Sequence, residues 1–528
     1  MKMHKREKKN TGWKGMIVGM MVLSLIACRH KVPEQNMAER SIIPLPSSIT
    51  PEEGAFRLKK RTVIAVDEGN EQLKAVGDYL AGLFNPATGY ELRVKEVKPS
   101  SEGGDIRLTL SNDAPDLGKE GYELKVSRRH MVIRANTPAG VFYGIQTLRQ
   151  LLPAAIEKDS VQPGPWLIPA GTICDCPVYE HRGVMLDVAR HFFPPEDVKR
   201  LIDEMTAFKL NRLHLHLSDD QGWRIEIKSW PRLTEIGAQT QVGGGKGGYY
   251  TQEEYKALVD YAASRFITLI PEIDMPGHTN AALASYAELN CDGKARELYT
   301  GTNVGFSTLC TRKEEVYKFI DDVVGEISAL TPGAWFHIGG DESHVTPMEE
   351  YIPFIERAQE IVARHDKQVI GWDEISHAGL RPGTIVQYWA RAENAKRAVE
   401  KGARVIMSPA DRTYLDMQYD SLCPLGLHWA GYVEVDQAYN WDPATLVEGI
   451  GREHIAGVES PIWTETITNM DDLNFMAFPR LAGHAEIGWS EAARRDWDDY
   501  RNRLGRFARR FQAMGIRFYH SPRVDWQE

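Results

Sequence analysis

The stretch RGVMLDVARHFFPPEDVKRLIDEMTAFKLNRLHLHL, residues 182–217, holds one complete strand–helix–strand unit and decides the fold. Its ends, 183–188 and 212–217, are short apolar runs of strand length. Between them, after the helix-starting pair Pro194-Pro195, apolar side chains recur at helical spacing. These side chains are Val198, Leu201, Ile202, Met205 and Phe208. We expect this stripe to cover a wall formed by the two strands.

The same alternation of a short apolar strand and a helical segment continues beyond residue 217. The expected strands are 183–188, 212–217, 267–273, 335–339, 369–372, 385–389, 404–407 and 455–458. Strands that alternate with helices form parallel sheets, and eight of them match a closed (β/α)8 TIM barrel. The sequence therefore predicts an α/β barrel domain over residues 176–528.

The preceding segment, residues 42–175, has a different pattern. Strand-like runs at 61–66 and 106–110 are mixed with a helical pattern at 140–152. Such mixing over a short segment predicts a smaller α+β domain in front of the barrel. This domain contains no obvious group of catalytic residues.

The N-terminus combines positive charge with a short apolar run, as signal peptides do. The run at 16–27 is too short to span a bilayer and ends in Leu25-Ile26-Ala27-Cys28, which resembles a bacterial lipobox. We therefore expect a lipoprotein signal peptide over 1–28, lipid on Cys28 and a polar tether over 29–41. The protein would be exported and anchored by lipid to the membrane of the bacterial cell envelope, on the periplasmic side or at the surface. An ordinary signal peptide or an uncleaved anchor is the alternative.

Charge excludes one class of partner. The chain has 73 acidic residues against 63 lysines and arginines, a net charge of −10, and the deficit is spread along the sequence. A strongly basic surface that suits a phosphate backbone is therefore not expected, and neither is a nucleic-acid partner.

The cysteines leave one question open. Cys291 and Cys310 flank a glycine-containing loop and could pair in an oxidising compartment, although sequence alone does not fix connectivity. Cys174 and Cys176 would point to opposite faces of an extended segment and not bond to each other. We interpret them as packing residues.

Polar and aromatic side chains gather where the expected barrel strands end. They are Asp187, Arg190, Asp219, Asp220, Asp274, His278, Asp341, Glu342, Trp372, Asp373, Trp389, Trp463 and Glu465. In a TIM barrel the C-terminal strand ends meet on one face, where the active site is built. We expect the active site on that face.

Asp341 and Glu342 are the most informative pair. Two adjacent carboxylates at a barrel mouth repel each other, which should raise the pKa of one of them. Successive residues of a strand point to opposite faces, so the backbone must bend for both to reach one pocket. Gly339-Gly340 can supply that bend.

His337-x-Gly339-Gly340-Asp341-Glu342 resembles the catalytic motif of family 20 β-N-acetylhexosaminidases. Further segments agree with the family in the same order: 182–192, 214–224, 271–278 and 371–374. The resemblance implies an exo-acting glycoside hydrolase that removes terminal non-reducing N-acetylhexosamines from glycans. It implies retention of configuration through an oxazolinium intermediate, with neither a cofactor nor a metal. The gluco and galacto epimers both remain candidates for the sugar.

The resemblance also implies roles for single residues. Glu342 would be the general acid and then the base, a role that requires a raised pKa, and Asp341 would hold the acetamide N–H. Tyr414 would donate to the acetamide oxygen, while Trp463 would form the floor under the sugar. The remaining substrate-binding residues would be Arg190, His278, Trp372, Trp389, Asp416 and Glu465. Asp219, Asp274 and His337 would lie near Glu342 and support it without contacting the substrate.

Three other interpretations of the sequence carry less weight. His214-x-His216 at a strand end could belong to a metal-dependent amidohydrolase, but that class needs more histidines on later strands. Residues 243–248 superficially resemble a phosphate loop and lack the Ser or Thr after Gly-Lys, which favours a loop at the barrel mouth. A non-catalytic sugar-binding protein would have no need for Asp341-Glu342.

Overall fold

The computed structural model describes residues 36–99, 103–111 and 114–527. The expected lipidation site, Cys28, and residues 29–35 of the expected tether lie outside this part of the chain. The tether expectation is wrong for residues 36–41, because the short helix η1 (Met37–Glu39) contacts the first sheet and buries Met37 completely. Among the described residues, no helix combines the length and apolarity needed to cross a membrane.

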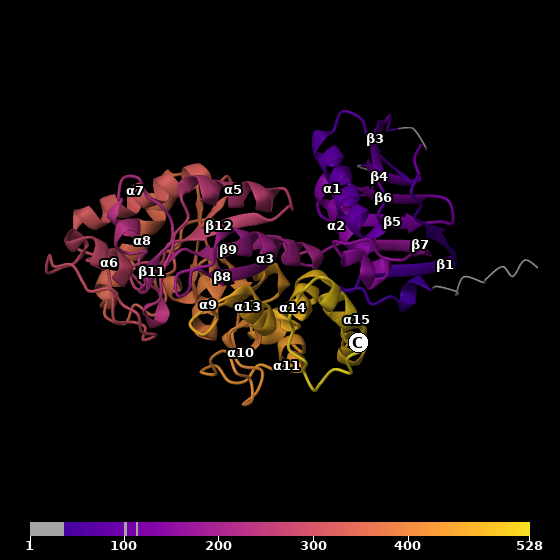
Figure 1. The fold of residues 1–528 in the computed structure, drawn as a ribbon. Coiled ribbons are helices and arrows are strands. Elements are labelled where there is room, and N and C mark those ends of the chain that lie inside the picture. Colours follow the sequence, from indigo (N-terminus) through magenta and orange to yellow (C-terminus); the bar gives the residue numbers. More distant parts are fainter. Residues whose placement is uncertain (1–35, 100–102, 112–113, 528) are drawn as a thin grey trace, which may run out of the picture. The chain divides into compact units, whose positions relative to one another are not determined.

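The smaller domain, indigo to violet in Figure 1, is a mixed seven-stranded sheet. Its strands are β1 (Ser48–Arg57), β2 (Val63–Asp67), β3 (Arg93–Val97), β4 (Ile106–Leu110), β5 (Tyr122–Val126), β6 (Met131–Ala135) and β7 (Leu167–Asp175), in the order β1-β7-β5-β6-β4-β2-β3. Helices α1 (Glu71–Thr88) and α2 (Pro138–Leu151) pack on each other and on the sheet. An α+β arrangement is what the mixed pattern predicts.

The second domain is the expected closed barrel of eight parallel strands. The strands are β8 (His181–Asp187), β9 (Arg212–His216), β12 (Thr268–Glu272), β13 (Trp335–His337), β14 (Gln368–Trp372), β15 (Ile385–Tyr388), β16 (Arg404–Met407) and β17 (Ile455–Ile462). All eight coincide with predicted strands. β17 continues past the predicted end, because polar residues such as Glu459 point into the barrel and interrupt the apolar run. β13 ends early, because Gly339 takes a left-handed φ of 64°.

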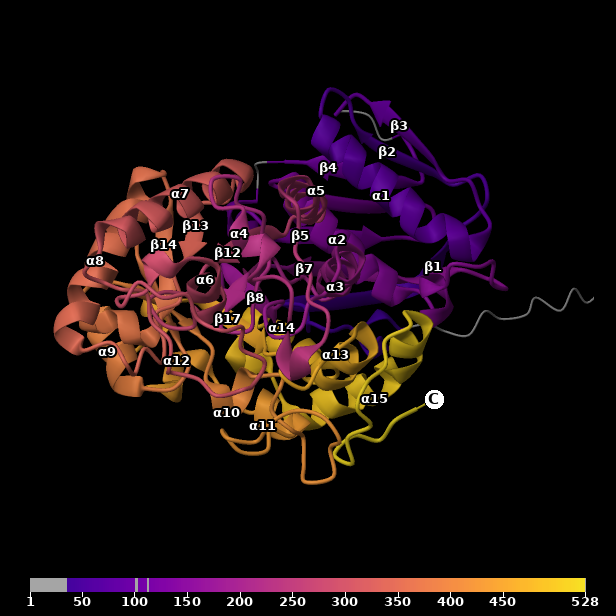
Figure 2. The ribbon, with the colours of Figure 1, turned by 60° about the vertical axis from the view of Figure 1, so that its left-hand side comes forward.

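Helices connect most of the strands and surround the barrel (Figures 1 and 2). The longer ones are α3 (Pro195–Ala207), α5 (Gln252–Ala263), α7 (Glu314–Leu330), α8 (Met348–Arg364), α9 (Ala392–Glu400), α13 (Met470–Ala477), α14 (Arg480–Trp489) and α15 (Trp497–Ala513). Shorter pieces are β10 (Ser218–Asp219), β11 (Gly222–Trp223), α4 (Arg232–Glu235), α6 (Asn280–Ser285), α10 (Ala410–Thr413), α11 (Val435–Tyr439) and α12 (Pro443–Leu446). Between β14 and β15 only a 3-10 turn, η6 (Asp373–His377), is formed, so a regular helix is missing there.

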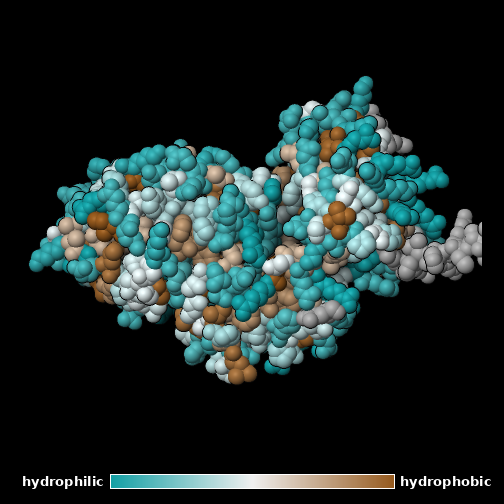
Figure 3. Space-filling model, in the orientation of Figure 1, coloured by the Kyte–Doolittle hydropathy of each residue, from teal (hydrophilic) through white to brown (hydrophobic). Residues whose placement is uncertain are grey.

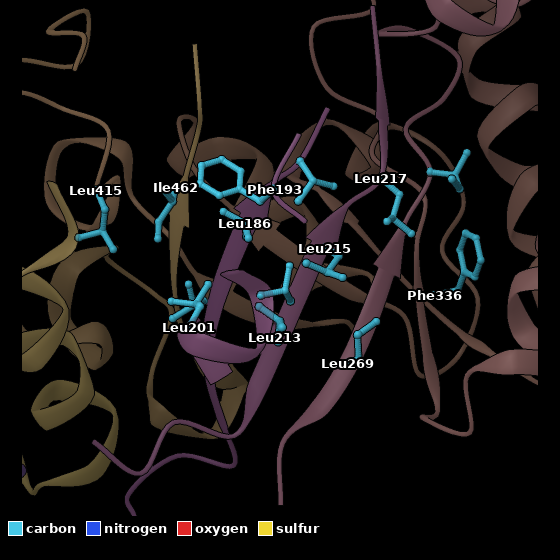
Figure 4. Close-up of a cluster of buried hydrophobic side chains, with 14 of the residues drawn as sticks. Leu186, Phe193, Leu201, Leu213, Leu215, Leu217, Leu269, Phe336, Leu415 and Ile462 are labelled. Atoms are coloured by element: carbon cyan, nitrogen blue, oxygen red, sulfur yellow. The ribbon is translucent and has the colours of Figure 1, made fainter. Parts of the chain in front are cut away.

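Strand β9 shows how the sequence divides the barrel wall from its interior. Leu213 and Leu215 pack with Leu201 of α3 in the apolar layer outside the strands (Figure 4). The alternating residues, His214 and His216, are buried without joining that cluster, and they contact carboxylates of other strands. The interior of this barrel is therefore partly ionic. On the outside, hydrophilic side chains cover most of the face seen in Figure 3.

Cys291 and Cys310 form a disulfide bond, which decides the pairing that the sequence left open. The bond closes a loop between α6 and α7 that reaches the mouth of the barrel. Cys174 and Cys176 are free thiols at the end of the first sheet.

Candidate active site

A cavity of about 440 Å³ opens at the C-terminal ends of the barrel strands. Nine of the residues that the sequence predicts for the site line it: Arg190, His278, Asp341, Glu342, Trp389, Tyr414, Asp416, Trp463 and Glu465. They come from loops after six different strands, so the barrel closure brings them together. A larger hollow of about 960 Å³ lies among α1, α2, α3 and α5. Its arginines Arg149 and Arg265 are already paired with Glu157 and Asp203.

The turn after β13 directs both adjacent carboxylates into the cavity. Gly339 and Gly340 have φ values of 64° and 103°, and Glu342 has a φ of 45°. A Cβ atom at position 339 would overlap the carboxylate of Asp274, so glycine is required there. The N–H of Gly340 donates to Asp274 Oδ1 at 3.0 Å, which fixes the turn. The expected glycine bend is present.

His278 stands between the two carboxylates and Asp219. Its Nδ1 contacts Asp219 Oδ1 at 3.2 Å. On the other side of the ring, Nε2 lies 3.5 Å from Glu342 Oε2 and 3.7 Å from Asp341 Oδ2. One imidazole is thus close to both carboxyl groups of the pair.

The surroundings shift the pKa values of these two carboxyls in opposite directions. Burial, followed by the carboxylate of Asp274, raises the pKa of Asp341 well above its usual value. Burial also acts to raise the pKa of Glu342, but His278 and Arg190 outweigh it and leave that pKa lowered. The expectation of one raised pKa is correct. The expectation that Glu342 has it is wrong, because Glu342 keeps 27% of its side chain exposed and contacts the imidazole, whereas Asp341 is more deeply enclosed.

The carboxyl of Asp274 is also shifted toward its protonated form. Burial raises its pKa to about 7, although the positive charge of His278 acts in the opposite direction. The three acids Asp274, Asp341 and Glu342 therefore do not all carry charge together near neutral pH.

Arg190 is held from two sides. Asp187 at the end of β8 accepts from the backbone N–H of Ala189 and of Arg190, which sets the loop. The Nη2 atom of Arg190 lies 2.8 Å from Asp219 Oδ2, and the guanidinium carbon lies 4.8 Å from the centre of the Trp463 ring. The arginine is therefore presented to the cavity in one orientation.

Aromatic rings form one side of the cavity. Trp389 is stacked parallel to Tyr414 with ring centres 6.4 Å apart, and Tyr414 lies 6.3 Å from Trp463. The indole N–H of Trp389 donates to Glu374 Oε2 at 3.0 Å. Rings so placed offer flat apolar faces to a sugar, while the polar atom of Trp389 stays bonded.

Two carboxylates facing this space have oxygens without a partner. Neither oxygen of Asp416 nor Oε2 of Glu465 accepts a hydrogen bond from any described residue. Burial, followed by repulsion from Glu465, raises the pKa of Asp416 well above its usual value. Buried acceptors without partners are rare, so a cavity lined by them suits a ligand rich in hydroxyl groups.

Four predicted site residues lie behind the cavity and do not line it. Asp219 contacts His278, and Asp274 accepts from the N–H of Gly340. Trp372 is 1% exposed, packs 5.8 Å from Trp463 and donates its N–H to Glu272 Oε1. His337 lies deeper, with Nδ1 3.0 Å from the same Oε1 atom, and contacts neither Asp341 nor Glu342.

The histidines of β9 do not fit a metal-dependent amidohydrolase. Four groups of His, Asp and Glu in the described chain do have ligand atoms within 4.8 Å of one another. His216, however, directs Nδ1 to Glu272 and Nε2 to Asp219, so neither nitrogen offers a lone pair. Residues 243–248 are not among those that line the cavity.

Sequence reasoning missed several cavity residues. Glu374 directly follows the motif residues Trp372 and Asp373, and its position at a strand end was a usable signal. Trp429 is 56% exposed, and its ring lies 5.9 Å from Trp389 and 5.8 Å from Tyr414. Its long loop after β16 has no periodicity that could have placed it. Thr302, Val304 and His344 reach the mouth from other loops.

Comparisons with known proteins agree with this geometry. Residues 179–351 and 343–492 match the family described as "Glycosyl hydrolase family 20, catalytic domain", and residues 39–176 match "Glycosyl hydrolase family 20, domain 2". The chain is 41% identical to a β-N-acetylhexosaminidase of Cellulomonas fimi, over 93% of this chain and 98% of that protein. It is 35% identical to a β-hexosaminidase of Porphyromonas gingivalis, covering 95% and 67%. The structure of Streptomyces plicatus N-acetyl-β-hexosaminidase in complex with Thio-NAglucal superimposes with a TM-score of 0.90 at 52% identity, covering 94% of this chain and 99% of that one.

Proposed function

Because the chain belongs to glycosyl hydrolase family 20, we propose a role for each cavity residue in its reaction. The protein is a β-N-acetylhexosaminidase. It removes a terminal, non-reducing N-acetylhexosamine from a glycan with retention of configuration, and the acetamide group of the substrate supplies the nucleophile.

One observation carries the assignment of roles. A carboxyl pair with separated pKa values, Asp341 and Glu342, faces the same cavity as the unpartnered acceptors of Asp416 and Glu465. The unpartnered oxygens suit sugar hydroxyls, and Arg190 offers hydrogen-bond donors in the same cavity. Trp463, beside Arg190, offers an apolar face for the sugar ring.

In the first step the acetamide oxygen attacks the anomeric carbon and the glycosidic bond breaks. Glu342 gives its proton to the departing oxygen. Asp341 accepts the acetamide N–H and balances the charge that develops on the forming oxazolinium ring, while the Tyr414 hydroxyl donates to the attacking oxygen. The stacked rings of Trp389 and Tyr414 support this placement, because they line the cavity and offer apolar surface to the acetamide methyl group.

In the second step a water molecule attacks the anomeric carbon, and Glu342 takes up the proton released. The ring opens, the acetamide re-forms, and two inversions at one carbon give net retention. Before each cycle Glu342 must hold a proton, although its pKa is lowered in the free protein. His278 lies within 3.7 Å of both carboxyls, which supports a proton shift from Asp341 to Glu342 once the sugar covers them.

The experiment that tests these roles varies the substrate. A plain β-glucoside lacks the nucleophile, and an oriented internal nucleophile lowers a barrier by about 7 to 11 kcal/mol. Its turnover should therefore be nearly undetectable beside the N-acetyl substrate. Fluorine atoms on the acetamide should slow cleavage progressively, and a thiazoline mimic of the intermediate should bind far more tightly than the product sugar. Comparable cleavage of the glucoside, or a sugar captured covalently on any carboxylate, would overturn the proposal.

We further propose that the protein is exported and held at the membrane of the cell envelope by lipid on Cys28. The lipobox-like Leu25–Cys28 segment after a basic, apolar N-terminus supports this. The Cys291–Cys310 disulfide is of the kind that persists in oxidising compartments. An envelope enzyme with this activity would meet its glycan substrates outside the cytoplasm.

A further inference from the structure

A row of alternating carboxylates and imidazoles runs through the interior of the barrel to the active site. This core row consists of Glu459, His214, Glu272, His216, Asp219 and His278, all at most 2% exposed. The successive contacts are His214 Nδ1 to Glu459 Oε1, 2.8 Å; His214 Nε2 to Glu272 Oε2, 2.9 Å; His216 Nδ1 to Glu272 Oε2, 2.6 Å; His216 Nε2 to Asp219 Oδ2, 2.9 Å; and His278 Nδ1 to Asp219 Oδ1, 3.2 Å. It brings together side chains from four strands, β9, β10, β12 and β17, and from one loop, which carries His278.

The position of His216 determines its protonation state. A neutral imidazole has one N–H and one lone pair. If His216 were neutral, one of its nitrogens would direct a lone pair at a carboxylate oxygen 2.6 or 2.9 Å away. The pKa values of Glu272 and Asp219 are both lowered, so both carboxyls are ionised and neither can donate to such a lone pair. Both nitrogens therefore carry protons, and His216 is an imidazolium ion between Glu272 and Asp219.

His214 occupies an equivalent place one step farther from the cavity. Its Nδ1 bonds to Glu459, and its Nε2 makes an ion contact with Glu272 that is not well aligned as a hydrogen bond. The core row thus alternates in charge from Glu459 to His278. Each charge in an alternating row costs less to bury than the same charge would alone, because its neighbours carry the opposite sign.

The pKa directions agree with this geometry. Burial alone would lower the pKa of His216, but the carboxylates of Glu272 and Asp219 raise it well above the usual value. For His214, burial likewise acts to lower the pKa, but the carboxylates of Glu272 and Glu459 outweigh it and raise the pKa to about 9. Burial acts to raise the pKa of Glu272, and three surrounding histidines instead hold it well below its usual range.

Glu272 is the branching point of the core row. Its Oε2 atom meets His216 and His214, while its Oε1 atom accepts from Trp372 Nε1 at 2.9 Å and contacts His337 Nδ1 at 3.0 Å. Asp219, one step nearer the cavity, also meets Arg190. Glu272 contacts none of the described residues that line the cavity, yet through His216 and Asp219 it is linked to the groups around Glu342.

We propose that Glu272 is a positioning residue for the reaction: it holds His216 as a buried imidazolium ion, and that charge holds Asp219 and His278 in place behind Glu342. The inference rests on the acid role proposed for Glu342. Removing the carboxylate of Glu272 changes the charge of its neighbour in the core row, His216. Without the carboxylate of Glu272, His216 keeps one proton and becomes neutral, so the positive charge beside Asp219 is lost.

Loss of the positive charge on His216 shifts the pKa of Glu342 in one direction that can be worked out. The groups that face Glu342 are His278, Asp341, Arg190 and His344. Those that face His216 are Glu272, Asp219 and Asp274. The imidazolium is nearer to Glu342 along the row than Glu272 is, so losing both charges makes the surroundings of Glu342 more negative. The pKa of Glu342 then rises, and it gives up its proton less readily.

The first test is spectroscopic and does not depend on the role of Glu342. In wild-type protein labelled with ¹⁵N-histidine, both ring nitrogens of His216 should remain protonated at pH 8, with assignment from a His216→Gln spectrum. A lone-pair nitrogen signal from His216 at that pH would overturn the proposal.

The second test is kinetic and uses Glu272→Gln, whose carbonyl oxygen can still accept from Trp372. Cleavage of an N-acetylhexosamine disaccharide, with its poor leaving group, should fall about 10- to 100-fold, because Asp219 and His278 no longer hold Glu342 in position and part of the general acid catalysis is lost. Cleavage of an activated aryl glycoside should fall less. The alkaline limb of the kcat/KM profile should move to higher pH, by roughly half a unit.

Glu459→Gln is the matched control, because Glu459 is equally buried and also meets two histidines, His181 and His214. It leaves His216 between its two carboxylates, so activity on both substrates should change less than about threefold. Equal losses in the two variants, or a Glu272→Gln loss that ignores the leaving group, would mean that these glutamates only maintain the fold. If Glu272→Gln does not fold, the wild-type spectrum still decides whether His216 is a buried imidazolium ion, and a neutral His216 overturns the proposal.

Discussion

Asp341 and Glu342 are neighbours in the chain, yet their surroundings shift the pKa values of their carboxyls in opposite directions. Asp341 is enclosed beside Asp274, so burial raises its pKa, whereas Glu342 lies 3.5 Å from His278, which lowers its pKa. In the free protein the pair therefore favours a proton on Asp341, the residue proposed to meet the acetamide. The role proposed for Glu342 as the acid therefore requires that the substrate, once bound, shifts this proton from Asp341 to Glu342.

Glu342→Gln should remove the proton donor without disturbing the fold. On substrates with poor leaving groups the rate should fall by roughly 10²- to 10⁴-fold, which is typical of lost general acid catalysis. Aryl glycosides with good leaving groups need little protonation and should lose less in the first step. Steady-state rates on a matched pair of substrates check this, and an equally large loss on both would contradict the assignment.

Arg190→Lys should weaken binding of the terminal sugar. A lysine cannot reach Asp187 and Asp219 together and still offer donors to the cavity. A hydrogen bond to a charged group contributes about 1.5 to 3 kcal/mol, so kcat/KM should fall about 10- to 100-fold, mainly through KM. Arg404→Lys serves as the control and should behave as wild type, because Arg404 begins β16 and the cavity lies at the C-terminal ends of the strands. A normal KM in Arg190→Lys would exclude this role.

Glu204 on α3 makes the stability of the protein depend on pH. Burial raises its pKa to about 7, although Asn474 and Arg200 act in the opposite direction, and its Oε2 atom has no described partner. A raised pKa means that the folded protein favours the protonated form. This stability is present below about pH 4.5 and is lost as the pH rises through about 7.

Glu204→Gln should therefore match wild type at pH 5 and be more stable at pH 8. A shift from 4.5 to about 7 corresponds to roughly 3 kcal/mol at most. Urea denaturation at the two pH values measures the difference. Glu157→Gln is the opposite control: burial is outweighed by Arg149 and Arg510, its pKa is lowered, and the substitution should destabilise the protein at pH 8. No gain for Glu204→Gln at pH 8 would contradict the prediction.

Cys28→Ser should release the protein from membranes or block its processing, because Cys28 would carry the lipid. Fractionation of cells into membrane and soluble material, with mass spectrometry of the mature N-terminus, checks this. An N-terminus elsewhere, without lipid, would contradict the anchor.

The sequence predicted the barrel well because local patterns encode it. On β9, leucines and histidines alternate, and this period of two assigns each side chain to the wall or to the interior. Glycines at 339 and 340 predicted the bend that brings both acids to the cavity. Trp429 and Val304 could not be predicted, because they lie on long loops whose paths depend on contacts with distant segments.

The sequence by itself determined the strands, the face on which they end and the identity of the acid pair, since periodicity and residue type are properties of the chain. The tertiary structure alone decided which acid keeps the proton, because burial and charge depend on neighbours that fold in from elsewhere. His214 meets Glu459 across a separation of 245 residues, and no local pattern records that contact. The ionic interior of the barrel exists only once the ring of strands has closed.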